Sequence, residues 1–421
     1  MFGTLFLKEC KQISKSITYY IFVACMAIFI ISQMGEFAGV HAPKKGLDNY
    51  GYTYSEDENE IMQMSIEGLV NEYVRNSYIA YPFGFYKKVI LSEKKQEQIG
   101  AILEAITGIT ILELNEQIID YWNFLSKNAS SDGNSEINND VEFPIKPAKD
   151  LSYEQFLTYM DEVDDLIGNG SNYSRSNIKS VNRVPKTYEQ AVREYEEIIY
   201  KDQVTRAFAR IFSDYMGIVL GILPVFLAVT RGLRDRRAQA ADVIFSKKAT
   251  STTIILSRYL STIVMILLPL LILSISPTLQ GLYSAKAAGV SGDAFAFLKV
   301  SLWWLLPTIL VSVSVGFFFT ELTNSAFGIL VQGIWWFISI FLSMDNLVGN
   351  VGWNLIPRFN MVGEYTIYKD ILPELIRNRL FYTAISILLV IATIVVYGYK
   401  RKGVLHLNGK KSSNRKSKPK I

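Results

Sequence analysis

Residue types that carry enzymatic or metal chemistry are scarce in this sequence and stand far apart. The two histidines are His41 and His406, and the two cysteines are Cys10 and Cys25, so no cluster of nitrogen and sulfur ligands has the spacing of a metal site. Neither an HExxH nor a GxSxG motif is present. Segment 403–412 faintly resembles a phosphate-binding loop, but the spacing between its two glycines is one residue too long. We therefore predict no catalytic residue, no metal ligand, no bound cofactor and no disulfide framework.

Two residues inside an apolar run are candidates for a transport pathway. Asp214 is the one ionisable residue in the run 211–230, and a carboxylate at mid-bilayer costs about 2.5–3.5 kcal/mol on insertion scales. Because it stands near one end of the run, we favour solvation at the membrane interface over a transport role. Pro224 lacks a backbone donor, so it is expected to kink its helix and leave carbonyl oxygens free for a pathway or a helix contact. Pro269 and Pro307 have the same property in other runs.

The elements that must position these residues are long apolar helices. Half of the 421 residues are apolar and only 19% are charged. A hydrocarbon core of about 30 Å needs about 20 helical residues, because only a helix satisfies its own backbone polar groups in lipid. We predict an all-α polytopic membrane protein with six transmembrane helices, at residues 16–35, 211–230, 253–277, 299–319, 325–344 and 380–399.

The distribution of charge predicts the orientation, since Lys and Arg are retained on the cytoplasmic side. The connection 231–252 is rich in arginine and lysine, whereas segment 36–210 contains 29 acidic and 18 basic residues. We therefore expect both termini and the inner turn 320–324 in the cytosol. The large insert 36–210 and the loops 278–298 and 345–379 are expected outside.

The two ends of the chain are expected at the cytosolic surface. Residues 1–15 form an amphipathic pattern with apolar and lysine-bearing sides, which predicts a helix lying in the interface; a simple extension of the first span is the alternative. We expect no signal-peptide cleavage, because the first apolar run reaches full spanning length.

For the basic tail 400–421 we favour a solvated segment over an RNA or lipid-headgroup patch, so no nucleic-acid partner is predicted.

The insert 36–210 has the pattern of a mainly helical soluble domain. Helical patterns cover 58–78, 91–106 and 115–127, and two further helices are expected to begin at capping boxes. These boxes are Ser152 with Gln155, followed by a core stripe at Phe156, Met160, Val163 and Ile167, and Thr187 with Gln190. Segments 128–140 and 168–182 are predicted loops. The helix after Thr187 is expected to run without a break into the second span as a stiff stalk.

The whole arrangement resembles the ABC-2 type transporter permeases, which are membrane subunits of ATP-driven exporters. The stretch RGLRDRRAQAADVIFSKKATSTTIILSRYLS, Arg231–Ser261, resembles the coupling segment of that family, in which a short cytosolic helix precedes a small-residue turn and the next span. The resemblance implies a separate ATPase subunit, which uses the ATP, and a second permease subunit, identical or different. It assigns contact with the ATPase to Arg234, Asp235, Arg236, Arg237, Val243, Ile244 and Phe245.

Two functions from different classes follow from these features. The first is a permease subunit of the bacterial cell membrane that exports a peptide, lipid-like or drug-like substrate. Two roles are open for the acidic insert: gating the exit of the pathway, or recognising a cationic peptide. The second is a membrane sensor or scaffold whose outer domain binds a ligand. A sensor normally has a cytosolic output domain, and the largest predicted inner segment has only some thirty residues, so we favour the permease.

Overall fold

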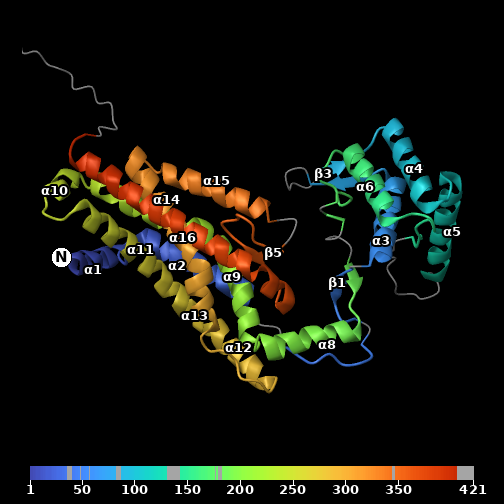
Figure 1. The fold of residues 1–421 in the computed structure, drawn as a ribbon, viewed down its shortest axis with the longest axis horizontal. Coiled ribbons are helices and arrows are strands. Elements are labelled where there is room, and N and C mark those ends of the chain that lie inside the picture. Colours follow the sequence, from blue (N-terminus) through green and yellow to red (C-terminus); the bar gives the residue numbers. More distant parts are fainter. Residues whose placement is uncertain are drawn as a thin grey trace, which may run out of the picture. The chain divides into compact units, whose positions relative to one another are not determined.

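The chain folds into two compact units, one apolar and one soluble in character. The computed structural model describes residues 1–35, 40–47, 49–55, 57–81, 87–129, 143–175, 177–178, 183–343 and 347–404. Residues 1–42 and 192–421 belong to the first unit, called here the bundle unit, and residues 43–191 to the second, called the inserted unit. Figure 1 shows both ribbons with their labelled elements.

The described part of the bundle unit is built almost entirely from helices. Two precede the inserted unit in the chain, and the others follow it. Their bounds are α1 Phe2–Ile13, α2 Ile17–Met34, α9 Thr205–Arg237, α10 Ala241–Phe245, α11 Ser251–Leu273, α12 Ile275–Ala287, α13 Ala296–Val300, the π-helical turn η3 Ser301–Leu305, α14 Leu306–Thr323, α15 Phe327–Phe341 and α16 Tyr365–Arg401.

Five helical stretches of the bundle unit are long and apolar enough to cross a membrane. They are α2, α9, α11 with α12, α13 to α14, and α16. The remaining predicted span, 325–344, contains α15, an apolar helix of 15 residues, about 22 Å at 1.5 Å per residue. The fold is therefore that of a mainly helical, multi-pass membrane protein with five helices of full spanning length among the described residues.

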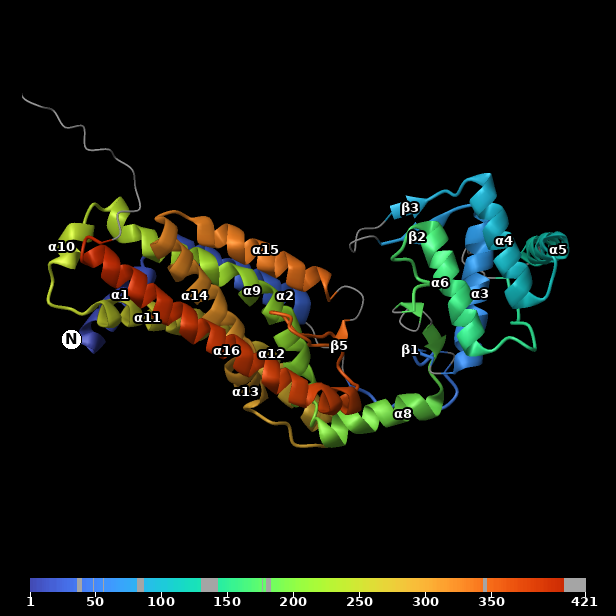
Figure 2. The same ribbon diagram turned by 45° about the horizontal axis from the view of Figure 1, so that its top comes forward.

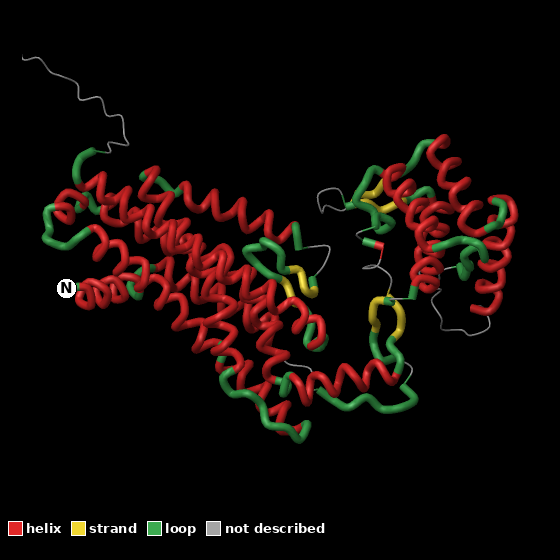
Figure 3. The backbone as a smooth tube through the Cα atoms, viewed as in Figure 1, coloured by secondary structure: helices red, strands yellow, loops and turns green. Residues whose placement is uncertain are grey.

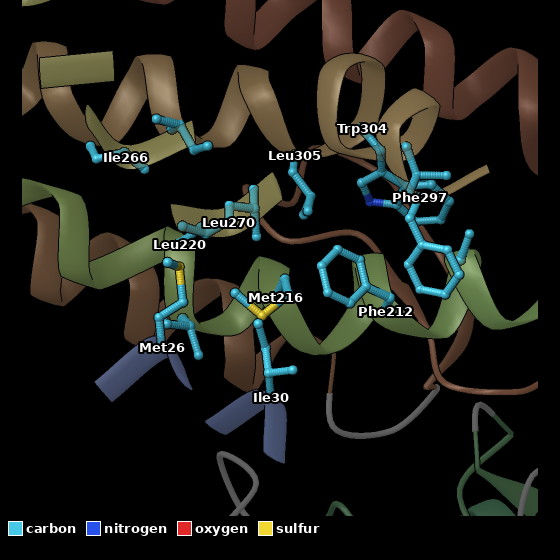
Figure 4. Close-up of a cluster of buried hydrophobic side chains, with 14 of the residues drawn as sticks. Met26, Ile30, Phe212, Met216, Leu220, Ile266, Leu270, Phe297, Trp304 and Leu305 are labelled. Carbon is cyan, nitrogen blue, oxygen red and sulfur yellow. The ribbon is translucent and has the colours of Figure 1, made fainter. Parts of the chain in front are cut away.

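Helix α9 lies at the centre of the bundle, in contact with α2, α14 and α15, while α14 also packs against α16. Figures 1 and 2 show α16 running beside α14 and α11 along the length of the unit. Figure 4 shows the buried core where α2, α9, α11 and the segment before α14 meet. The labelled side chains are Met26, Ile30, Phe212, Met216, Leu220, Ile266, Leu270, Phe297, Trp304 and Leu305.

Glycines allow α9, α14 and α15 to approach closely. A Cβ atom added to Gly316 of α14 would stand 2.6 Å from the Cβ of Ala228 on α9. A Cβ added to Gly328 of α15 would stand 3.2 Å from the Cα of Gly316. Lipid-embedded helices associate through such close backbone packing, because lipid tails are as apolar as the side chains themselves.

Helices extend into two of the expected outer loops, and one expectation for a connecting segment is wrong. The expected loop 278–298 contains most of α12 and the first residues of α13, and α16 already begins within the expected loop 345–379. The expected continuous stalk is also broken. Helix α8 (Tyr188–Glu196) and the π-helical turn η2 (Glu197–Lys201) end before Asp202, and α9 starts only at Thr205. The physical reason is a turn with positive φ at residues 203 and 204, which no right-handed helix accommodates.

The described part of the inserted unit has its own hydrophobic core. Figure 3 shows its helices and short strands. Its elements are β1 Tyr52–Tyr54, α3 Glu58–Arg75, β2 Tyr78–Ala80, β3 Lys87–Val89, α4 Glu93–Thr107, α5 Ile111–Ala129, α6 Tyr153–Ile167 and β4 Arg183–Pro185. Strand β1 pairs with β4 and β2 with β3, both antiparallel.

Local sequence signals in the inserted unit are confirmed where the structure describes them. The capping box of Ser152 and Gln155 starts α6, and the reciprocal bonds of Thr187 and Gln190 start α8. The predicted stripe Phe156, Met160, Val163 and Ile167 is buried. Most of the predicted loop 128–140 and the tail from 405 onward lie outside the described residues.

Candidate functional site

The short helix α10 joins two long helices of the bundle unit. Helix α9 ends at Arg237, and Gln239 adopts a φ of 52°, which turns the chain before α10 begins at Ala241. Thr250 then caps α11, because its hydroxyl oxygen accepts a hydrogen bond of 3.1 Å from the backbone N–H of Thr253. Helix α10 therefore lies in the connection between α9 and α11, within the segment 231–252 whose first seven residues belong to α9.

The end of α16 holds the turn that follows α10. The Arg401 guanidinium donates hydrogen bonds to the carbonyl oxygens of Phe245 (2.9 Å), Lys247 and Ala249. The ring of Phe245 meets the ring of Tyr397 edge to face, with 5.5 Å between centroids. Because one charged donor binds three carbonyl groups of the same turn, α10 and α16 are tied together at this end of the bundle.

A buried ion cluster lies at the same end and includes the N-terminal helix. The Arg231 guanidinium of α9 donates to both carboxylate oxygens of Glu9 on α1 and, at 3.2 Å, to Asp235. Arg258 of α11 pairs with Asp235 and lies 3.7 Å from a Glu9 oxygen. Two arginines and two acids thus neutralise each other across three helices, which a buried charge requires. The cluster fixes α1 against α9 and α11.

The inward face of α1 contains most of its predicted apolar side together with Glu9. Glu9 and Ile13 are buried and Leu5 and Phe6 are half-buried, whereas Phe2 is exposed. Lys8, Lys11 and Lys15 are exposed, as expected for a helix with a lysine-bearing side. Apolar packing and the ion pair with Arg231 therefore hold the same face of α1 against the bundle.

The seven predicted coupling residues all lie at this end of the bundle, but only some face outward. Arg237 is exposed, Arg236 is half-buried, and the exposed Arg234 donates a 2.8 Å hydrogen bond to Gln12 of α1. Asp235 belongs to the ion cluster. The α10 residues have different surroundings: Val243 is 59% exposed, while Ile244 and Phe245 pack against a small core of Ala249, Ile254, Ile255 and Tyr397.

Sequence reasoning missed four residues that build this site: Glu9, Arg258, Tyr397 and Arg401. Glu9 is the single acid in a helix otherwise bearing lysines, and Arg258 immediately precedes an uncharged run. Either feature could have indicated a partner. Their mutual pairing could not be inferred, because Glu9 and Arg231 are 222 positions apart in the chain.

The two predicted pathway residues lie farther along α9, away from α10. Asp214 is 0% exposed, and its carboxylate accepts hydrogen bonds from the Arg358 Nε (2.7 Å), the Arg358 Nη2 (3.0 Å) and the backbone N–H of Phe359 (2.7 Å). The expected solvation of Asp214 is therefore wrong. Its charge is matched by Arg358, which lies in a short strand 144 positions later, and no local pattern could show this pairing.

Pro224 lies in a buried stretch of α9 that α15 contacts through polar side chains. Gln332 donates a 2.5 Å hydrogen bond to the carbonyl oxygen of Gly221, and the Trp336 indole N–H donates at 2.8 Å to the carbonyl oxygen of Ile218. A proline removes the helical hydrogen bond to the carbonyl four residues earlier, which is that of Leu220, so these two contacts do not depend on Pro224. Helix α15 thus contacts α9 beside Pro224, and the expected pathway role of Pro224 stays a prediction.

Irregular backbone between α15 and α16 is buried at the far end of the bundle from α10. This stretch includes β5 (Val348–Asn350) and β6 (Arg358–Phe359), which pair antiparallel. The buried Arg379 of α16 donates to the carbonyl oxygens of Trp304 (3.0 Å) and Leu355 (3.2 Å) and to the hydroxyl of Thr308 (2.8 Å). Buried polar groups of non-helical backbone need such partners, because they are shielded from water.

The described residues contain no group of three or more His, Cys, Asp or Glu side chains that could hold a metal ion. Burial raises the pKa of the Cys10 thiol, which disfavours the nucleophilic thiolate. Comparison of the chain with protein-family models, curated proteins and solved structures found no match. The site is therefore interpreted from its own geometry: a helical connection clamped to four helices of an apolar bundle.

Proposed function

We propose that this chain is the membrane permease subunit of an ATP-binding cassette exporter, driven by a separate ATPase subunit. The observation that supports it is the attachment of α10. It is covalently continuous with α9 and α11, and Arg401 ties the turn after it to α16. The ion cluster next to it connects α9 and α11 to α1. A force on α10 would reach four helices, which is what a coupling element between an ATPase and a transport pathway requires.

The charges near α10 agree with a cytosolic location of this end. Exposed basic side chains gather there on α1, the end of α9 and the turn after α10: Lys8, Lys11, Lys15, Arg234, Arg237, Lys247 and Lys248. With this end inside, α15 counts as a sixth, short span, both termini are cytosolic, and residues 43–191 fold outside the cell, as the positive-inside rule requires. A bacterial cell membrane is the proposed location.

The proposed ATPase contact includes fewer residues than the seven that the family resemblance assigns to it. Val243 is the α10 side chain with the most exposed apolar surface among those described, and Arg237 supplies an exposed charge nearby in the chain. An apolar anchor surrounded by steering charges is typical of a protein interface. A second permease subunit, identical or different, completes the proposed pathway, and the substrate is a peptide, a lipid-like or a drug-like molecule.

Co-purification tests the ATPase contact. A tagged chain is isolated from its native membrane, and bound proteins with ATP-binding cassette motifs are identified by mass spectrometry. Val243→Asp is expected to reduce ATPase recovery at least tenfold, because a charge replaces an apolar anchor while α10 keeps its contacts through Ile244, Phe245 and Arg401. Val74→Asp is the matched control, since Val74 is 49% exposed in the inserted unit. Equal recovery with both variants would reject the assignment.

Accessibility labelling tests the proposed orientation. In a background with Cys10→Ser and Cys25→Ser, a cysteine at Lys248 is expected to react with a membrane-impermeant maleimide only after the cells are opened. A cysteine at Leu112, which is 75% exposed in the inserted unit, is expected to react in intact cells. Labelling of position 248 in intact cells would exclude a cytosolic ATPase as the partner of α10.

A further inference from the structure

A turn of unusual backbone geometry separates η2 from α9. Gln203 has a φ of 51°, and Val204 has φ 59° and ψ −57°. The backbone N–H of Thr205 donates a 2.5 Å hydrogen bond to the carbonyl oxygen of Gln203, two residues earlier. This i to i+2 bond around a residue with positive φ and negative ψ defines the rare, strained form of the γ-turn. Val204 is its central residue.

The residue at the centre of this turn makes the strain larger. A β-branched side chain at positive φ crowds its own backbone, and glycine is the residue that adopts this conformation without strain. Val204 is nevertheless 0% exposed and belongs to the hydrophobic core of the bundle unit. Such strain persists only where the surroundings hold the conformation, and it tends to mark positions that change conformation.

A buried ion pair holds the turn from the side of α9 and α16. The Arg210 guanidinium pairs with both oxygens of Asp202, with 2.6 Å from Nη2 to Oδ2, and donates to the carbonyl oxygens of Val362 (3.3 Å) and Gly363 (3.2 Å). It also lies over the ring of Tyr368, 4.6 Å from the centroid. Asp202 and Arg210 are 1% and 2% exposed, so neither charge has water as an alternative partner.

The residue after the turn is held from a second side, by the connection between α12 and α13. The Thr205 hydroxyl accepts a 2.7 Å hydrogen bond from the backbone N–H of Asp293. Its methyl group fills the space that Cβ atoms at Gly281 and Gly292 would occupy, at 3.2 and 2.8 Å. The start of α9 is thereby anchored, so a change at residues 202–204 would move the segment before the turn rather than α9 itself.

We propose that residues 202–205 form a strained joint, held by the Asp202–Arg210 pair, whose release lets η2 and the end of α8 change direction relative to α9. The joint is a conformational device within the bundle unit, a few residues after the point where the chain leaves the inserted unit. It does not depend on the exporter proposal, because it requires neither an ATPase nor a transported substrate.

The first test compares glycine and alanine at the centre of the turn. Both Val204→Gly and Val204→Ala lose side-chain packing, but only glycine also relieves the strain of positive φ. We therefore expect the full-length Gly variant to have a higher thermal unfolding midpoint in detergent than the Ala variant. At Val313, a buried helical valine of α14, the order is expected to reverse, because glycine is the poorer helix former.

The second test measures movement with nitroxide labels in the Cys10→Ser, Cys25→Ser background. One pair spans the joint, Glu196→Cys with Tyr283→Cys, and a control pair lies on its α9 side, Tyr283→Cys with Leu380→Cys; all three positions are exposed. Asp202→Asn is expected to broaden the 196–283 distance distribution or add a second population, and to leave the 283–380 distribution unchanged. Glu321→Gln, which alters another buried ion pair of the bundle, is expected to change neither.

Both results are required. An Ala variant at 204 as stable as the Gly variant, or more stable, would show that the turn is unstrained. A distance distribution between positions 196 and 283 that Asp202→Asn leaves unchanged would show that the ion pair does not hold the joint. Either outcome overturns the proposal, and if Asp202→Asn gives no folded protein, the comparison at Val204 decides alone.

Discussion

Glu9 of α1 and Arg231 of α9 form a buried ion pair through both oxygens of the carboxylate, although 222 positions separate them in the chain. The pair holds the N-terminal helix against the bundle. Arg258 and Asp235 complete the cluster, so its net charge is zero. Removal of one member leaves an unbalanced buried charge, which costs more than the loss of a hydrogen bond.

Glu9→Gln is therefore expected to destabilise the bundle unit by on the order of 3 kcal/mol, since Arg231 and Arg258 would share only Asp235. Thermal unfolding of the full chain in detergent measures the loss, and hydrogen exchange of residues 2–13 reports whether α1 detaches. Lys8→Gln, at the neighbouring exposed position, is the control and is expected to change neither. If the two variants unfold alike, the cluster does not hold α1.

Gly316→Ala is expected to destabilise the bundle by about 1–3 kcal/mol, because the new Cβ would stand 2.6 Å from the Cβ of Ala228 and force α9 and α14 apart. Gly333→Ala, in α15, has no atom within 4 Å of its new Cβ and is expected to be neutral or stabilising by up to about 1 kcal/mol. Unfolding midpoints of the two variants check the contrast. Equal effects would mean that the helices are not closely packed at Gly316.

Arg401→Met is expected to free the turn after α10, because three carbonyl groups lose their hydrogen-bond donor. The free energy of unfolding is expected to fall by on the order of 2 kcal/mol. A nitroxide attached at Val243→Cys in the Cys10→Ser, Cys25→Ser background is expected to move faster, as its electron paramagnetic resonance spectrum would show. Lys402→Met, at the exposed next position, serves as the comparison. An unchanged spectrum in the Arg401 variant would argue against the tie between α10 and α16.

The inserted unit is expected to lose stability as pH rises toward neutrality. Glu72 accepts hydrogen bonds from the Ile79 N–H (3.1 Å) and the Tyr173 hydroxyl (2.8 Å), which lower its pKa, but burial outweighs them and raises the pKa from 4.5 to about 7. The folded state thus binds this proton more tightly than the unfolded state. Its contribution is fully present below about pH 4.5 and is lost as pH rises through about 7, by up to ~3 kcal/mol.

Urea unfolding of fragment 43–191, followed by circular dichroism at pH 5 and pH 7.5, measures this effect. The fragment is suitable because it has its own hydrophobic core. Glu72→Gln is expected to remove most of the difference between the two pH values, whereas Glu67→Gln on the same helix is expected to retain it. A difference that survives in the Glu72 variant would assign the titration to another group.

The sequence by itself determined the helical, membrane-embedded character of the chain and several helix ends. These are local properties: about 20 consecutive apolar residues suffice to span a hydrocarbon core, and a capping box such as Ser152 with Gln155 satisfies donors within one turn. The position of the connection 231–252 also followed from the apolar runs, because this segment lies between two of them. Its proposed coupling role stays a prediction.

Only the tertiary structure decided which charges meet and where the helices break. Asp214 was expected in water and is instead paired with Arg358, and Glu9 was not singled out at all. The stalk looked continuous, yet it breaks at Val204, because Arg210 and the turn near Asp293 hold its backbone in place. In each case the stabilising free energy comes from contacts between groups that are distant in the chain and meet only after the helices have packed. A local sequence pattern therefore cannot predict these contacts.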